Sequence, residues 1–193
     1  MWKEIAPAFR MTLVFTILTG LLYPGLVTGL CQLLFPHAAQ GSLVSVNGQV
    51  VGSSLIGQNF TKPEYFQPRP SAAGSGYDGF ASSGSNYGPT SQKLIDRVRA
   101  SIDQFYKDDP DYHGPIPSDL VTASASGLDP HISPASAAAQ AARIAKARGI
   151  ATDQLQQFIA DHTEPRTLGF LGEPRVNVLK LNLELDRRYP VKK

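Results

Sequence analysis

Cysteine is almost absent from this sequence. The 193 residues contain a single cysteine, Cys31, which lies inside an apolar segment. One thiol excludes a disulfide within the chain, and it excludes the cluster of thiolates that holds a structural zinc ion. The folded part of the chain must therefore depend on its hydrophobic core for stability.

Charged side chains are also few, and neither sign dominates. Lys, Arg, Asp and Glu make up 18% of the residues, and the formal net charge is +2. Binding to nucleic acid depends largely on an excess of basic side chains that contact phosphates. We therefore expect no nucleic-acid partner.

The sequence motifs of the common enzyme classes are missing. There is no G-x-x-x-x-G-K-[ST] phosphate loop, no H-E-x-x-H zinc helix and no G-x-S-x-G nucleophile elbow. Ser126, Asp129 and His131 lie close together, but residues so near in sequence rarely converge into a catalytic triad. Asp129-Pro130 favours a turn that leads into a helix. His131 has no spaced partners for a metal, so we expect it to face solvent or to bond a helix cap.

A long apolar run is the most prominent feature that is present. Residues 11–35 contain no Asp, Glu, Lys, Arg or His. A helix rises about 1.5 Å per residue, so this run can cross a hydrocarbon core of about 30 Å. A cleavable signal peptide is the alternative, but its apolar region covers roughly 7 to 15 residues and ends in small side chains, unlike Phe35-Pro36-His37. We predict a retained transmembrane helix at 11–35, between an N-terminal segment (1–10) and a soluble domain (36–193).

The flanking charges indicate the orientation of this helix. Lys3 and Arg10 precede the apolar run, and the next Lys or Arg after it is Lys62. Positive charges beside a membrane helix tend to remain in the cytoplasm. We therefore expect a single-pass protein of the cell inner membrane, with residues 1–10 cytoplasmic and the soluble domain periplasmic.

Small and polar residues recur along the apolar run at helical spacing. Membrane helices use such residues to bring two backbones close together. The candidates for packing against a partner helix are Thr12, Thr16, Gly20, Gly25 and Gly29. Tyr23-Pro24 predicts a bend within the span, because proline has no N–H group for the helix.

The soluble part begins with the signal of a β-hairpin. Asn47-Gly48 separates two short runs, 42–46 and 49–51, and this dipeptide favours a two-residue hairpin turn. Residues 60–90 are rich in Gly, Pro and Ser, a composition that suits a flexible linker. Tyr and Phe recur within this stretch, so we predict an ordered irregular loop instead.

Helical patterns follow the irregular stretch. Apolar residues within 94–105 recur every three to four positions and predict one helix. A second helix is predicted over 134–149 with Ser133 as its N-cap, and Thr152 is expected to cap a short third helix. Residues 176–186 alternate as in a strand, yet their composition favours a helix; both remain open, with the helix preferred. The expected fold class is α+β: one transmembrane helix, then a small extracytoplasmic domain with a hairpin and three to four helices.

A few polar residues of the soluble domain are candidates for binding or for ordering loops. Gln140 lies among alanines on the second predicted helix, where we expect a solvated polar face. Arg69 lies between two prolines, and its guanidinium suits a carboxylate or carbonyls of a partner, or it holds the domain's own loop. The candidates for partner contact or loop ordering are Asn59, Arg69, Asn86, Asp129 and His131.

Several longer segments carry a resemblance to a known family. They are T-G-L-L-Y-P-G-L-V-T-G, L-I-G-Q-N-F, R-P-S-A, G-S-N-Y-G-P, D-L-V-T-A-S-A-S-G-L-D-P-H-I-S-P and T-L-G-F-L-G-E-P-R-V-N-V-L-K-L-N-L-E-L-D. Through their order and spacing, essentially the whole chain resembles the C subunit of the Kdp high-affinity potassium-transporting ATPase of bacteria. One departure is Ser83, where the family commonly has glycine in S-G-G-S-N.

The resemblance implies an accessory subunit without turnover and without a cofactor of its own. The implied partners are a channel-like potassium-binding subunit and a P-type ATPase subunit that hydrolyses ATP. The family is described as a catalytic chaperone that raises the ATPase subunit's affinity for ATP, and a glutamine that matches Gln140 is implicated as the nucleotide contact. The positive-inside rule places Gln140 outside the cytoplasm, so the residues and the resemblance disagree on this point.

The residues themselves favour a role in assembly. In this hypothesis the membrane helix packs against a span of a partner subunit, and the domain covers the outer mouth of the channel-like subunit. Two other classes stay open. One is a membrane-anchored periplasmic hydrolase that uses Ser126, Asp129 and His131, and the other is an anchored ligand-binding module.

Overall fold

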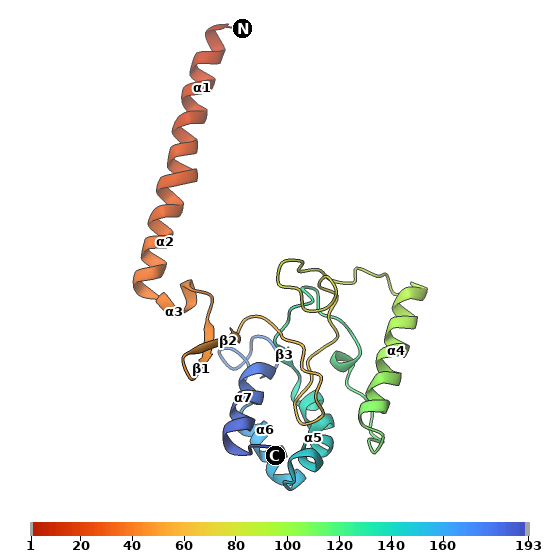
Figure 1. The fold of residues 1–193 in the computed structure, drawn as a ribbon. Helices are drawn as coiled ribbons and strands as arrows, with labels where there is room; N and C mark the ends of the chain where they lie inside the picture. The colour runs from red at the N-terminus through yellow and green to blue at the C-terminus, as the bar shows by residue number, and fades with distance from the viewer. Residues whose placement is uncertain (1, 192–193) are drawn as a thin grey trace. The chain divides into compact units, whose positions relative to one another are not determined.

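The computed structural model describes residues 2–191. The chain divides into two compact units, one up to Val51 and one from Gly52 onward, and each is considered by itself (Figure 1). Its helices and small two-stranded sheets confirm the predicted α+β class.

The first unit is dominated by one long apolar helix. It consists of α1 (Trp2–Ile17), a π-helical turn η1 (Leu18–Leu22) and α2 (Tyr23–Leu34), which together form a continuous helix of 33 residues. At about 1.5 Å per residue its length of about 50 Å is sufficient to cross a bilayer. None of its residues is buried within the chain. Among residues 2–191 there is therefore one candidate membrane span, and this helix begins earlier than the predicted 11–35.

The sequence predicted a bend at Tyr23-Pro24. The structure has a π-helical turn there, directly before Tyr23. The Tyr23 N–H donates to the Leu18 carbonyl, five residues back. Pro24 has no N–H to continue the α-helical pattern at this point. A π turn adds one residue to the helix, so residues five apart lie about one turn apart.

The predicted β-hairpin follows the helix. After a short helix α3 (Pro36–Ala39), strand β1 (Leu43–Val46) pairs with strand β2 (Gln49–Ser53). Asn47 and Gly48 form the turn with φ of +52° and +80°. Positive φ at both positions matches the twist of a two-residue hairpin, so this prediction is confirmed.

The second unit builds its core from three C-terminal helices. These are α5 (Pro134–Arg148), α6 (Thr152–Asp161) and α7 (Val178–Arg188). The short strands β3 (His131–Ile132) and β4 (Val176–Asn177) pair antiparallel, with His131 opposite Asn177. Helix α4 (Gln92–Asp108) lies to the side of this group, and a 3₁₀ turn, η2 (Ser118–Leu120), follows it (Figure 1).

The ends of these helices test the predicted caps. The Ser133 hydroxyl accepts the Ser136 N–H of α5 at 3.0 Å, and Gly149 ends the same helix at φ +67°, so both ends are confirmed. The predicted Thr152 cap is wrong, because α6 starts one residue earlier and Ala151 occupies the N-cap without a side-chain bond.

Residues 176–186 form a helix after two strand residues. Asn177 caps α7 by accepting the Lys180 N–H at 3.1 Å. The buried side chains of α7 include Val178, Leu181 and Leu185, which follow the helical period. The alternation seen in the sequence is therefore coincidental, and the preference for a helix is confirmed.

Candidate functional site

The irregular stretch 60–90 contains no helix or strand, and its first part is held by buried side chains of α5 and α7. In Figure 1 this segment runs beside both helices, as the hydrogen bonds require. We call residues 63–71 the clamped loop. Its order is a consequence of long-range contacts and not of local backbone pattern.

Two buried amides each bind the backbone of one loop residue. The Gln140 Oε1 accepts the Gln67 N–H at 2.7 Å, and its Nε2 donates to the Gln67 carbonyl at 3.1 Å. The Asn182 Oδ1 accepts the Phe66 N–H at 2.9 Å, and its Nδ2 donates to the Phe66 carbonyl at 2.9 Å. Consecutive loop residues thus receive the donor and acceptor that a neighbouring β-strand would otherwise supply.

The remaining bonding capacity of Gln140 is also occupied. Its Nε2 donates to the Ser136 carbonyl at 3.3 Å, and its Oε1 accepts from Arg143 at 2.9 Å. Gln140 is 1% exposed, so the predicted solvated face is wrong. The alanines beside it are the reason, because short side chains on α5 let the clamped loop approach and cover the helix.

Two arginines of α5 bind the carbonyls that precede these amide contacts. Arg143 donates to the carbonyls of Pro63 and Tyr65, and Arg148 donates to the Glu64 carbonyl at 2.8 Å. Arg148 also pairs with Asp186 at 2.8 Å, although its own side chain is fully buried. Burial lowers the pKa of Arg143, and the charge of the nearby Asp109 opposes this shift. These arginines satisfy loop carbonyls that would otherwise be unbonded.

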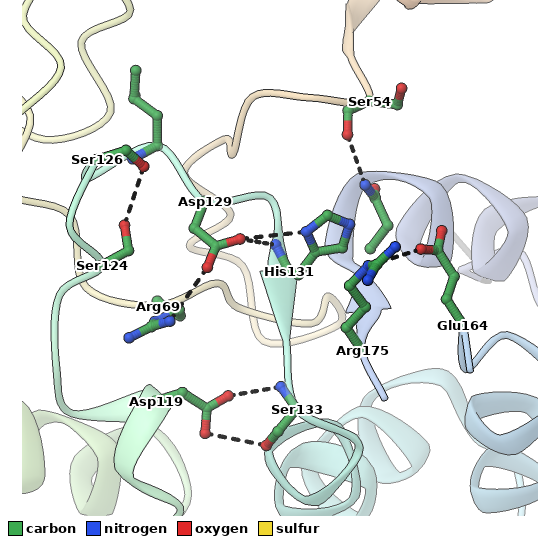
Figure 2. Close-up of polar contacts among 12 residues, drawn as sticks. Ser54, Arg69, Asp119, Ser124, Ser126, Asp129, His131, Ser133, Glu164 and Arg175 are labelled. Carbon is green, nitrogen blue, oxygen red and sulfur yellow. Dashed lines mark hydrogen bonds and ion pairs between the residues drawn. The ribbon is translucent and has the colours of Figure 1, made fainter. Parts of the chain in front are cut away.

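A second cluster joins the other end of the clamped loop to the turn before β3. Arg69 Nη1 lies 3.3 Å from Asp129 Oδ2, and His131 Nδ1 lies 3.4 Å from Asp129 Oδ1. Asp129 also accepts the backbone N–H of His131 at 3.0 Å, as expected of an Asx turn. Figure 2 shows Asp129 between the Arg69 guanidinium and the His131 imidazole. Arg69 therefore holds the domain's own loop, one of the two roles that the sequence left open.

The electrostatics of this cluster follow from its burial and its charges. Burial would raise the pKa of Asp129, but hydrogen bonds from His131 and the charge of Arg69 outweigh it and hold the pKa below its ordinary value. Burial also raises the pKa of the Tyr77 hydroxyl, which donates to the Arg69 carbonyl. Asp129 is thus a fixed anion at neutral pH.

The serine of the hypothetical triad does not join this pair. The Ser126 hydroxyl accepts the Leu128 N–H at 3.1 Å and lies 3.4 Å from the Ser124 hydroxyl. Figure 2 shows these two serines on the far side of the turn from His131. Within the described residues, no hydrogen bond joins Ser126 to His131, which a nucleophile and its base require.

An open cavity lies between the clamped loop and α4. Its volume is about 590 Å³, and Arg69, Arg97, Asn59 and Gln140 are among its lining residues. Arg97 donates to the Ser71 carbonyl at 2.7 Å, and Arg69 Nε is buried without a partner among the described residues. Among residues 2–191, no group of three or more His, Cys, Asp or Glu side chains lies close enough together to hold a metal ion.

The remaining predicted contact residues lie in different places. Asn59 is at the cavity wall, whereas Asn86 adopts φ +51° in the irregular stretch, a conformation that asparagine tolerates well. Partner contact by either residue stays a prediction. The sequence analysis did not identify Arg143, Arg148 and Asn182. Each is a polar residue on the apolar side of its helix, and this position could have indicated a buried polar contact.

The long apolar helix presents the predicted packing residues as a connected series. Thr12, Thr16 and Gly20 are spaced by four residues, and a Cβ on Gly20 would lie 3.9 Å from the Thr16 methyl group. Gly25 follows Gly20 by five residues, but the π turn between them keeps the two about one turn apart. Within the chain, space for a Cβ at Gly25 and Gly29 is open. Their packing against another helix stays a prediction.

The long apolar helix, followed by a domain whose polar side chains bind its own backbone, fits the class of single-pass membrane proteins. The chain matches the family of the K⁺-transporting ATPase c chain over residues 5–187, and it belongs to that family. Its role is therefore that of an accessory subunit in potassium transport.

Curated relatives support this membership across nearly the full length. A potassium-transporting ATPase KdpC subunit from Myxococcus xanthus is 58% identical over 190 residues, which cover 98% of this chain and 90% of the relative. Subunits of the same name from Koribacter versatilis and Rhodospirillum rubrum are 53% and 52% identical, and the alignments cover 99% of this chain and 98% and 99% of theirs. The resemblance seen in the sequence is thereby confirmed.

Proposed function

We propose that this chain is a non-catalytic subunit that stabilises the assembly of an ATP-driven potassium import complex. Its membrane helix packs against a channel-like subunit, and its domain covers the outer mouth of that subunit. A companion P-type ATPase subunit hydrolyses ATP. The observation that supports this most is the connected series of Thr12, Thr16, Gly20, Gly25 and Gly29, which the π turn keeps in line on an unburied helix.

Purification of the assembled complex tests the packing role. Gly25→Leu with Gly29→Leu adds bulk to the series, and Val27→Leu with Cys31→Leu adds bulk at the same spacing on the opposite side. We expect the glycine variant to retain about a tenth or less of the companion subunits, equivalent to about 1.4 kcal/mol of association free energy. The control should retain them fully. Intact complexes with the glycine variant would contradict the packing role.

The orientation of the domain requires its own test. We propose that residues 1–10 are cytoplasmic and that the domain is periplasmic in the inner membrane, as the distribution of Lys and Arg favours. A cysteine at the exposed Lys146, in a chain with Cys31→Ser, can be labelled with a membrane-impermeant maleimide in intact spheroplasts. Labelling before lysis is expected, and labelling only after lysis would reverse the orientation.

A second proposal concerns ATP. The position of Gln140 in the wall of a cavity that also contains Arg69 and Arg97 is compatible with a nucleotide contact that raises the ATPase subunit's affinity for ATP. However, the amide must give up bonds to the clamped loop to bind a ligand directly. Photolabelling of the assembled complex with 8-azido-ATP tests this contact. Label in this chain would support it, and label only in the ATPase subunit would exclude it.

A further inference from the structure

Asp109 is a buried carboxylate whose charge the fold does little to stabilise. It is 4% exposed, and its Oδ2 is buried without a hydrogen-bond partner among the described residues. It also occupies the C-cap of α4, where the partial negative charge of the helix end repels an anion. Buried carboxylates usually accept hydrogen bonds or pair with a cation. The charge of Asp109 therefore destabilises this conformation of the domain.

Arg143 of α5 is the cation that acts most strongly on this carboxylate. The chain after α4 runs along α5, because Asp111 Oδ2 lies 3.0 Å from Lys146 Nζ. Arg143 lies one helical turn before Lys146, and Asp109 lies two residues before Asp111. Burial raises the pKa of Asp109, and among the surrounding charges that of Arg143 opposes the rise most. The two groups are thus neighbours, although Asp109 Oδ2 stays unbonded.

In the described conformation the guanidinium of Arg143 bonds uncharged oxygens instead. It donates to the carbonyls of Pro63 and Tyr65, and to Gln140 Oε1 at 2.9 Å. Pro63 is exposed and Tyr65 half-buried, so water can bond these carbonyls when the arginine leaves. Asp109 Oδ2 is closed to solvent, and a bond between two charged groups is roughly twice as strong as a neutral one. Arg143 therefore has two competing sets of acceptors.

We propose that Arg143 is a latch that exchanges the clamped loop for Asp109. In the closed state, which the structure describes, Arg143 holds carbonyls of the loop. In the open state it pairs with Asp109, and the loop separates from α5. Separation frees the Gln140 amide, which cannot bind a ligand fully while both its polar atoms hold Gln67. The latch lies within this chain and goes beyond the proposed function.

Hydrogen exchange at two neighbouring amides detects the open state. The Gln67 N–H bonds Gln140 of α5, whereas the Phe66 N–H bonds Asn182 of α7. Release from α5 alone therefore exposes the first amide and leaves the second bonded. Both rates can be followed by NMR of the ¹⁵N-labelled full-length chain in detergent micelles. No companion subunit is needed, so failure of the latch would leave the proposed function intact.

Asp109→Asn should weaken the open state, because asparagine keeps the shape of aspartate but not its charge. We expect the protection of Gln67 to rise about tenfold relative to that of Phe66. Asp111→Asn is the matched control, since Asp111 is exposed, and it should change this ratio by less than about twofold. An equal change at both amides would indicate a general gain in stability and would overturn the latch. No change, or the same rise in the control, would also overturn it.

Acidification provides an independent measurement on the wild-type chain. The raised pKa of Asp109 means that this carboxylate gains a proton before an ordinary aspartate as the pH falls. A protonated Asp109 attracts Arg143 less, so the protection of Gln67 relative to Phe66 should rise, after correction for the intrinsic pH dependence of exchange. The Asp109→Asn variant should lack this rise. It retains the other charged groups around the pair, which are Glu64, Asp108, Asp111 and Lys146. A rise of equal size in wild type and variant would contradict the latch.

Discussion

Replacing Gln140 by leucine separates a structural role of this amide from a ligand-binding role. Leucine has a similar volume but cannot bond the backbone of Gln67, which Gln140 contacts at 2.7 and 3.1 Å. The N–H and carbonyl of Gln67 would then lie half-buried without their partners. The variant should therefore release the clamped loop from α5 even when no other protein or nucleotide is present.

The size of the effect follows from the two unmade bonds. A buried polar group without a partner costs about 1–3 kcal/mol, and half-burial of Gln67 lets water recover part of this. We expect the free energy of unfolding to fall by about 2–4 kcal/mol. For a domain of this size, at about 2–4 °C per kcal/mol, the unfolding temperature should fall by roughly 4–16 °C.

Thermal unfolding of the full-length protein in mild detergent, together with limited proteolysis of the clamped loop, measures this effect. Gln157→Leu is the matched control, because Gln157 is exposed and its amide donates to the nearby Asp161 at 2.8 Å. Its effect should stay within about 0.5 kcal/mol. If Gln140→Leu unfolds at the wild-type temperature and its loop resists protease equally, the clamp does not stabilise the domain and the reasoning is refuted.

Three further predictions concern caps and charges. Ser133→Ala should destabilise the protein by about 1 kcal/mol in chemical denaturation, because α5 loses its N-cap, whereas Thr152→Ala should have little effect. Burial raises the pKa of Asp109, whose Oδ2 has no hydrogen-bond partner among the described residues. Asp109→Asn should therefore be more stable by about 1 kcal/mol at pH 7, and this advantage should disappear as the pH falls below about 4, where aspartate is protonated in the unfolded chain as well. The pKa of Asp129 is lowered, so its charge stabilises the fold above about pH 4. This contribution is lost as the pH falls through the pKa of Asp129 in the folded state. Wild type and Asp129→Asn should therefore converge in stability in strong acid. A pH-independent difference for either aspartate would contradict its assigned charge.

Local signals in the sequence were sufficient for much of the fold. The hairpin at Asn47-Gly48, the N-cap Ser133 and the C-terminal Gly149 each depend on a few adjacent residues, and all three were predicted correctly. Thr152 failed because threonine is common both at a cap and just inside a helix, and only the backbone decides between the two.

The candidate site could not be predicted in the same way. The burial of Gln140 depends on a loop 73 residues earlier in the chain, and that loop has no periodic pattern that would reveal which helix it covers. The same holds for Asn182 and Phe66, which are 116 residues apart. Arg69 and Asp129 were recognised as candidates, but a sequence cannot show whether an arginine bonds its own domain or a partner.

The clamped loop also imposes an order on folding. Phe66 is synthesised long before Asn182, so the loop emerges into solvent without the amide that will later bind it. Closing a connection of this length costs chain entropy that only the packed helices α5 and α7 can offset. The loop should therefore become ordered as one of the last steps, after α7 has docked, and a chain shortened before Asn182 should leave this segment open to proteases even if α5 has formed.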